Sequence, residues 1–259
     1  MKNLFIAACL LSMAWLPTAQ GEELRLENSS SVPVPLSDFI PEGQTIADTT
    51  ILVLERGKFL GKNSESSLPP TTQLAGLSIG ESSTATLVAG SMKLDVKGNV
   101  TVGGEGVGVL AIQLGTCLTW GGQLAVRGQG STRQSSVSVV RERAQHVGGK
   151  SMVLSDATLM VVFASTRHLN EFVNSGAPVI ELSESLEIEP GVTAEIVLNN
   201  DHIDNDPANK FLPTGEYVIV SAKTYKGEVP ELVVNGFDTT QQGPLSLERR
   251  DGNLVLLVK

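Results

Sequence analysis

The chain has 259 residues, a formal net charge of −9 and an aromatic content of only 4%. Nucleic acids and anionic membrane surfaces are bound through basic patches, so an acidic protein is a poor match for both. We expect neither as a partner. The 26 glycines and 12 prolines separate many short runs of Val, Leu, Ile and Thr. This composition favours an all-β protein with a core of aliphatic side chains.

The N-terminal segment 1–21 has the features of a signal peptide. Lys2 is the only charged residue before Glu22, and the mostly apolar run 4–16 suits a signal core but is too short to span a bilayer. Small residues near Gly21 predict cleavage after it, which takes the net charge from −9 to −10. Cys117 is then the only cysteine, so no intrachain disulfide can form. No later stretch reaches the roughly 18 apolar residues of a membrane helix, and we expect no membrane span after cleavage.

Residues 22–76 are expected to form an extended N-terminal cap region. Apolar and alternating runs predict strands at 22–26 and 50–54. Residues 28–41 contain three prolines. They predict an extended connector, because proline cannot donate a hydrogen bond to a β-ladder. Residues 58–72 are polar and include two adjacent prolines, which predicts a loop.

Residues 77–163 are expected to form a β-repeat region, because short runs with a period of two follow one another between glycine turns. Strands are predicted at 77–79, 85–89, 92–96, 107–114, 137–140 and 159–163. In 92–97 the apolar and charged side chains alternate without exception, which indicates one buried and one solvated face. The charged segment 141–150, in which Gly148 and Gly149 precede Lys150, predicts a hairpin tip or a short exposed turn.

The strongest pattern in this region is an internal repeat. Residues 94–106 align with residues 118–130 at a shift of 24, with apolar residues matched at four places and glycine at three. The shared frame encodes two short strands separated by glycine turns, a unit that stacks on copies of itself. It predicts four pairs stacked in neighbouring layers: Leu94 with Leu118, Val96 with Trp120, Val100 with Leu124, and Val102 with Val126. Trp120 is accordingly predicted to be a core residue that faces Leu118.

Residues 164–259 are expected to form a C-terminal β-unit that includes the only predicted helix. The period changes to three and four over 166–174, with Ser165 or Thr166 as the N-cap and Gly176 near the C-cap. Strands are predicted at 179–182, 186–188, 192–198, 217–222, 231–234, 245–247 and 254–258. Asp251-Gly252 lies between the last two and favours a hairpin turn.

The repeat at 94–130 and the segment 186–196 resemble the autotransporter-associated β-strand repeats of exported bacterial surface proteins. The closing runs 215–220, 234–237 and 245–256 are similar to the last β-unit of such passengers. The resemblance implies a parallel β-helix or related β-solenoid, secreted or held in the envelope of a Gram-negative-type cell. Full autotransporters also carry a membrane barrel of amphipathic strands with aromatic girdles. This aromatic-poor sequence shows no such strands, so we expect no self-translocation. A compact β-sandwich is the alternative fold if the repeat is accidental.

The residue types that carry chemistry are few and scattered. His146, His168 and His202 have no i, i+4 spacing and no neighbouring cysteine, which argues against a zinc site. The run Gly104-x-Gly106-x-Gly108 lies between predicted strands and opens no helix, so a phosphate-binding loop is not expected. We therefore assign no catalytic, cofactor-binding or metal-binding residue.

One acidic loop leaves alternatives open. Asp201, Asp204 and Asp206 provide hard oxygen ligands of the kind that calcium prefers, but their order does not match an EF-hand loop. A solvated turn is the favoured interpretation, calcium binding an alternative, and a pair of sugar-cleaving carboxylates a further one.

These observations together predict an exported structural or adhesive protein, not an enzyme, with no cofactor. Its partners would be other envelope or extracellular components. Two alternatives remain. One is a polysaccharide-acting enzyme on a β-helix, for which carboxylates and bases should cluster across successive layers. The other is a compact β-sandwich binding module.

Overall fold

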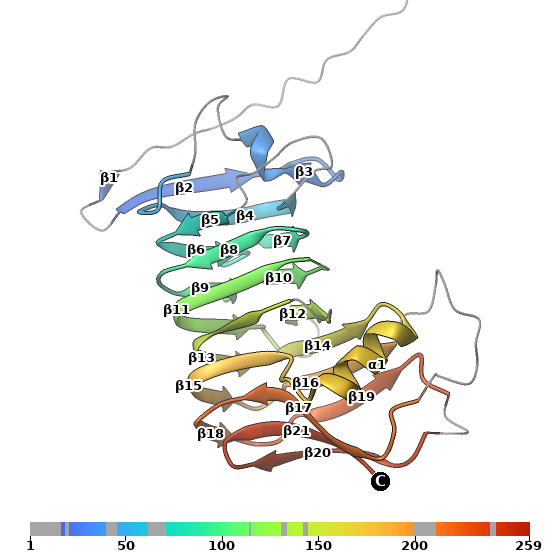
Figure 1. The fold of residues 1–259 in the computed structure, drawn as a ribbon. Helices are drawn as coiled ribbons and strands as arrows, with labels where there is room; N and C mark the ends of the chain where they lie inside the picture. The colour runs from blue at the N-terminus through green and yellow to red at the C-terminus, as the bar shows by residue number, and fades with distance from the viewer. Residues whose placement is uncertain are drawn as a thin grey trace, which may run out of the picture.

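The structure is a computed structural model that describes residues 17–18, 21–39, 46–61, 71–113, 115–130, 134–141, 145–198, 211–238 and 242–259. The described chain is all-β with one α-helix, and it winds into a column of stacked coils from β2 near one end to β20 at the other (Figure 1). Strands from successive coils pair in parallel along three faces of the column. The predicted β-solenoid is therefore confirmed, and the compact β-sandwich alternative is wrong.

Each face is a ladder of strands. Face 1 contains β5 (Thr71–Leu74), β8 (Lys93–Val96), the first parts of β11 (Cys117–Arg127), β13 (Val147–Ser155) and β15 (Ile180–Ile188), then β17 (Gly215–Ser221), β21 (Asn253–Val258) and β20 (Leu245–Arg250). Face 2 contains β2 (Gly21–Glu27), the first part of β4 (Ile51–Leu60), β6 (Gly76–Ile79), β9 (Val100–Gly103), the second parts of β11, β13 and β15, and β18 (Thr224–Gly227). Face 3 contains β3 (Val34–Pro35), the second part of β4, β7 (Thr84–Ala89), β10 (Val107–Ile112), β12 (Ser135–Val140), β14 (Ala157–Phe163), β16 (Thr193–Leu198) and β19 (Glu231–Asn235).

Antiparallel pairing occurs only at the two ends of the described ladder. The short β1 (Pro17–Thr18) pairs with β2 at the N-terminal end. At the C-terminal end β21 pairs with β17 and with β20. Asp251 and Gly252 join β20 to β21 with φ of 46° and 87°, which confirms the predicted hairpin and explains the turn residues, since glycine and Asp tolerate the left-handed region.

The alternation of the strands builds the core, because every second residue points into the column. In-register side chains therefore stack in files along the axis. One file on face 2 consists of five residues that are all 0% exposed: Leu54, Ile79, Val102, Val126 and Leu154. This aliphatic packing stabilises the fold without a disulfide, as Cys117 is a free thiol.

The 24-residue repeat corresponds to two neighbouring coils. β11 pairs in parallel with both β8 and β9, and the register contains all four predicted pairs, Leu94–Leu118, Val96–Trp120, Val100–Leu124 and Val102–Val126. The same ladders continue across the expected region boundaries at 76/77 and 163/164, because β4 pairs with β6 and β14 pairs with β16. The described strands between residues 22 and 259 thus belong to one stack.

The predicted helix is confirmed as α1 (Thr166–Ser175). Ser165 caps its N-terminus by accepting a hydrogen bond from the His168 amide, and Gly176 ends it with φ of 61°. Phe172 faces the column and lies 5.2 Å from Phe163 between ring centroids. The helix is therefore an insertion between β14 and β15 that packs on the side of the stack (Figure 1).

Four sequence predictions need correction. The loop predicted at 58–72 is wrong at both ends, because β4 continues to Leu60 and β5 begins at Thr71; residues 62–70 lie outside the described residues. β4 is a long strand that turns the corner between faces 2 and 3 at Gly57, where φ is 98°. Its polar corner residues point outward and hide the strand pattern.

The exposed turn predicted at 141–150 is also wrong in its described part. Arg141 is only 5% exposed and donates a hydrogen bond to the carbonyl of Gln145, while β13 already begins at Val147. Burial lowers the pKa of the Arg141 guanidinium. The strands predicted at 179–182 and 186–188 form the single strand β15, and the connector 28–41 contains a 3₁₀ turn at Leu36–Phe39.

Candidate functional site

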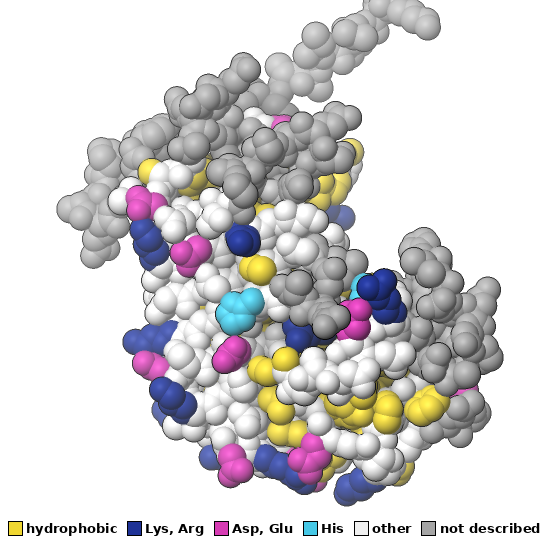
Figure 2. All heavy atoms as spheres, viewed as in Figure 1, with side chains coloured by type: hydrophobic (Ala, Val, Ile, Leu, Met, Phe, Trp, Pro, Cys, Tyr) yellow, Lys and Arg dark blue, Asp and Glu magenta, His cyan; other side chains and the backbone are white. Residues whose placement is uncertain are grey.

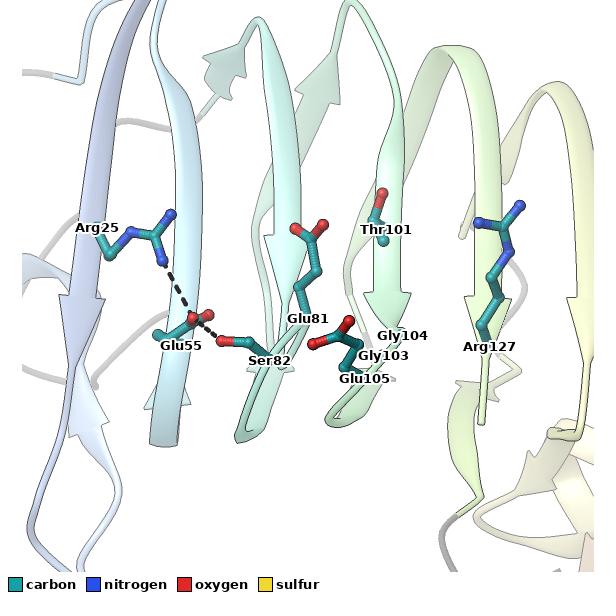
Figure 3. A pocket seen from close by; sticks show the side chains of 9 residues that line it. All are labelled: Arg25, Glu55, Glu81, Ser82, Thr101, Gly103, Gly104, Glu105 and Arg127. Carbon is teal, nitrogen blue, oxygen red and sulfur yellow. Dashed lines mark hydrogen bonds and ion pairs between the residues drawn. The ribbon is translucent and has the colours of Figure 1, made fainter. Parts of the chain in front are cut away.

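A groove crosses successive coils near the corner between faces 2 and 3. Its volume is about 550 Å³, and its lining residues come from β2, β4, β9, β11 and the turns after β6 and β9 (Figure 3). They are Arg25, Glu55, Glu81, Ser82, Thr101, Gly103, Gly104, Glu105 and Arg127. An arginine stands at each end in Figure 3, and the three glutamates lie between them.

The register of the solenoid places these residues side by side. Thr101 of β9 pairs with Ser78 of β6, and Gly103 pairs with Arg127. Glu81 and Glu105 follow β6 and β9 at equivalent turns, and their positions differ by 24, the spacing of the internal repeat. Glu81 and Glu105 therefore occupy equivalent places on neighbouring coils.

Glycine allows the coils to approach closely at this corner. A Cβ added at Gly106 would lie 1.9 Å from the Ser83 carbonyl oxygen, and one at Gly108 would lie 2.3 Å from the Ile79 oxygen. Gly103 and Gly104 have φ of 76° and 146°. The predicted structural role of this glycine run, a turn between two strands that opens no helix, is confirmed.

Arg25 and Glu55 form the bonded end of the groove. Arg25 donates to Oε1 of Glu23 at 2.8 Å and to Oε1 of Glu55 at 3.1 Å. The hydrogen bond to Glu23 raises the pKa of Arg25, and burial opposes that shift only in part. Ser82 donates to the same oxygen of Glu55. Glu55 is 8% exposed, and its second oxygen, Oε2, is buried with no hydrogen-bond partner in the described residues.

The other end of the groove is less constrained. Glu81 accepts a hydrogen bond from the Ser78 hydroxyl at 2.9 Å. Within the described chain the carboxylate of Glu105 and the guanidinium of Arg127 make no hydrogen bond or ion pair. With Arg25 already paired, two carboxylates and one guanidinium lie outside the described ion pairs, so this part of the groove carries excess negative charge.

A second hollow of about 520 Å³ lies on face 1 and is lined by residues of β11, β13 and β15. Its lining residues are Thr119, Trp120, Gly121, His146, Gly148, Gly149, Lys150, Glu181, Ser183 and Glu184. Lys150 and Glu184 form an exposed ion pair at 3.7 Å. Surface pairs of this kind contribute little, so the polar rim is ordinary solvated surface.

Trp120 belongs to the core beneath this hollow. Its residue exposure is 2%, and its indole Nε1 donates to the Ser151 carbonyl at 2.9 Å. A Cβ at Gly149 would lie 2.5 Å from two atoms of the indole, so the ring is covered by the backbone of the next coil. The prediction that Trp120 packs in the core is confirmed, and the ring offers no stacking surface for a sugar.

The candidate ligand residues stay apart where the structure describes them. His146 lines the second hollow and His168 lies in α1, while His202, Asp201, Asp204 and Asp206 fall outside the described residues. Among the described residues no three His, Cys, Asp or Glu side chains are grouped to hold a metal ion. The solvated-turn and calcium interpretations of the acidic loop both stay predictions.

Sequence reasoning did not find the groove. The sequence pattern assigned no role to the charged residues that line it: Arg25, Glu55, Glu81, Glu105 and Arg127. The repeat held a usable signal, because extending its shift of 24 backward from Glu105 reaches Glu81.

Comparison of the chain with protein-family models, with curated proteins and with solved structures finds no match in any of the three. The likeness to autotransporter-associated repeats therefore stays a prediction. Within the described residues there is no helix with the length and apolar character needed to cross a membrane.

Proposed function

We propose that the chain is an exported structural or adhesive protein, secreted or held in the envelope of a Gram-negative-type bacterium, and that it performs no catalysis. The observation that carries the proposal is the uninterrupted parallel ladder from β4 to β19 on face 3. Such a ladder forms a rigid column whose inner residues maintain the fold and whose outer residues are free to contact other molecules.

Two further features support this proposal. The core consists of stacked aliphatic side chains and needs no disulfide, so the fold tolerates any redox environment. The N-terminal run before Glu22 has the composition of a cleavable signal. Other envelope or extracellular components remain the proposed partners.

Expression of the full chain in a Gram-negative host tests export and surface display. We expect the N-terminal sequence of the released or envelope fraction to begin at Glu22, and whole cells to bind an antibody against the solenoid. Cells that express the chain should adhere to a glycan-coated or protein-coated surface better than cells with an empty vector. Retention of Met1 in a cytoplasmic product would refute the proposal.

The structure also gives one observation in favour of the enzyme alternative. Glu55, Glu81 and Glu105 lie on successive coils, and strands in a ladder are spaced by about 4.8 Å. Carboxylates one or two coils apart therefore fall near the roughly 5–10 Å separations that glycoside cleavage uses. Release of new reducing ends from polysaccharides, lost in Glu105→Gln, would support this second function. No release from any tested polysaccharide would support the first.

A further inference from the structure

We propose that the groove between Arg25 and Arg127 binds a saccharide that carries free amino groups, an oligomer of amino sugars. The inference rests on the adhesive part of the proposed function and names the ligand of its contact site. It follows from the charge of the groove, from an unsatisfied acceptor in its wall and from the spacing of its side chains.

Charge is the first argument. Arg25 is bonded to two glutamates, which leaves Glu81, Glu105 and Arg127 as the groove's charged groups outside the described ion pairs. The whole chain adds a net charge of −9. Its field attracts cations and repels anions, so a ligand with ammonium groups is favoured over an acidic one.

The buried carboxylate of Glu55 is the second and independent argument. Its Oε1 accepts hydrogen bonds from Arg25 and Ser82, whereas its buried Oε2 has no partner in the described residues. Figure 3 shows this carboxylate turned toward Ser82 and Glu81, within the row of groove residues. A buried acceptor without a donor is costly, so the site favours a ligand that brings N–H or O–H groups.

A metal ion fits the groove less well than a long ligand does. The described residues contain no group of three His, Cys, Asp or Glu side chains suited to hold a metal ion. Glu55, Glu81 and Glu105 therefore do not form such a group. The carboxylates are spread along the column on separate coils. They suit several contacts to a long ligand better than a single coordination sphere.

Spacing separates a saccharide from a peptide. Groove residues recur at the coil spacing of about 4.8 Å, whereas alternate side chains of an extended peptide recur at about 6.6 Å. A pyranose unit is close to one coil spacing in length, so successive units can meet successive coils. The hydroxyls of Ser82 and Thr101 and the Arg127 guanidinium complement ring oxygens and hydroxyl groups.

The mode of recognition follows from the lining. None of the groove residues is aromatic, and the nearby Trp120 is buried beneath another face. Binding must then come from charge-assisted hydrogen bonds instead of ring stacking. We expect it to weaken strongly as salt is added, because exposed charges are screened.

Calorimetric titration of the full chain with a hexamer of glucosamine tests the inference. The hexamer of N-acetylglucosamine has the same backbone without the ammonium groups, and an oligolysine of similar length has the ammonium groups without the sugar. We expect the glucosamine hexamer to bind, and each of the other two to bind at least about tenfold more weakly, as the loss of a charge-assisted contact implies. Equal binding of the acetylated hexamer or of oligolysine would overturn the proposal.

Variants locate the site. Glu105→Gln and Glu81→Gln should each weaken binding of the glucosamine hexamer about tenfold. Glu105 is exposed and has no partner among the described residues, so its variant should fold normally even if Glu81→Gln does not. Glu189→Gln is the matched control, because Glu189 is an exposed glutamate just after β15 on a distant coil. An equal effect of Glu189→Gln would reduce the result to general electrostatic attraction and reject the groove.

The outcome is separable from that of the proposed function. An exported, adherent protein that does not bind the glucosamine hexamer rejects only the ligand assignment. A protein that binds the hexamer through Glu105 but stays in the cytoplasm rejects only the exported role. Cleavage of the hexamer during titration would reject non-catalytic binding and support the enzyme alternative.

Discussion

Replacement of Leu124 by Ala should reveal how far the stacked files of side chains carry the stability of the fold. Leu124 is 0% exposed and lies in register between Val100 of β9 and Met152 of β13. The substitution removes buried methyl groups from a file whose neighbours are fixed by backbone pairing on both sides, so the space cannot close. We expect a loss of about 3–5 kcal/mol in the free energy of unfolding, the upper part of the range for such truncations.

Gln123→Ala is the matched control, because Gln123 is the adjacent, outward-facing residue, and in the described structure its hydrogen bonds come from the backbone, whose amide donates to Oδ1 of Asn99, and not from its side chain. Its cost should stay within about 0.5 kcal/mol. Urea unfolding followed by the fluorescence of the buried Trp120 and by circular dichroism measures both variants. Agreement of the two signals checks that unfolding is all-or-none. A Leu124→Ala cost below about 1 kcal/mol, or a control as damaging as the test variant, would refute the importance of the stacked file.

Three other predictions probe the corner, the C-terminal cap and the surface. Gly108→Ala should destabilise the fold by about 1–3 kcal/mol in urea unfolding, because the new Cβ would lie 2.3 Å from backbone atoms of two other residues. Desolvation raises the pKa of Tyr225 to about 12, and the Arg249 cation opposes this shift. Between about pH 10 and 12 this tyrosine is ionised in the unfolded chain but still protonated in the folded one, so the stability of the fold should fall as the pH rises through that range. After allowance for solvent screening the part due to Tyr225 should be on the order of 1 kcal/mol, and Tyr225→Phe should remove that part but leave the smaller loss due to Tyr217, whose pKa burial also raises. The hydrogen bond from Lys97 lowers the pKa of Asp48. The small contribution of this pair to stability should therefore be present at neutral pH and disappear as acid protonates Asp48. Melting curves of Lys97→Ala should lack this acid-dependent loss.

Inward-facing residues explain why much of the fold was predictable. Burial imposes apolar side chains at every second position, and the turn after β9 requires glycines, so two coils of equal length look alike in sequence. The pairs Leu94–Leu118 and Val102–Val126 followed directly from that likeness. The helix was predictable for a similar reason, since Ser165 and Gly176 mark both of its ends.

The unequal length of the other coils limited the prediction. The shift is 24 from Leu94 to Leu118, but Leu118 pairs with Val147 and Gly148 with Glu181, shifts of 29 and 33. Insertions at the corners, including α1, absorb the difference without disturbing the ladder. A constant period therefore covers only a small part of the stack, and register elsewhere depends on contacts that one sequence does not reveal.

Outward residues were hidden for a different physical reason. An outward position is compatible with many side chains, so burial imposes no pattern that marks Glu55 or Arg141 as special. Arg141 is buried where it donates to the Gln145 carbonyl, and Glu55 where it accepts from Arg25, which comes from an earlier coil. Both depend on packing between segments that are distant in sequence.

The same separation of inner and outer residues governs how the protein can be altered. An inward change such as Leu124→Ala acts on the stacked file and should lower stability, whereas Glu105 points away from that file and has no partner to lose in the described chain. Glu105→Gln should therefore leave the urea midpoint unchanged while it weakens binding of the glucosamine hexamer. A solenoid built in this way can acquire or lose a ligand through its outer row without any adjustment of its core, because backbone pairing and not side-chain contact sets the position of that row.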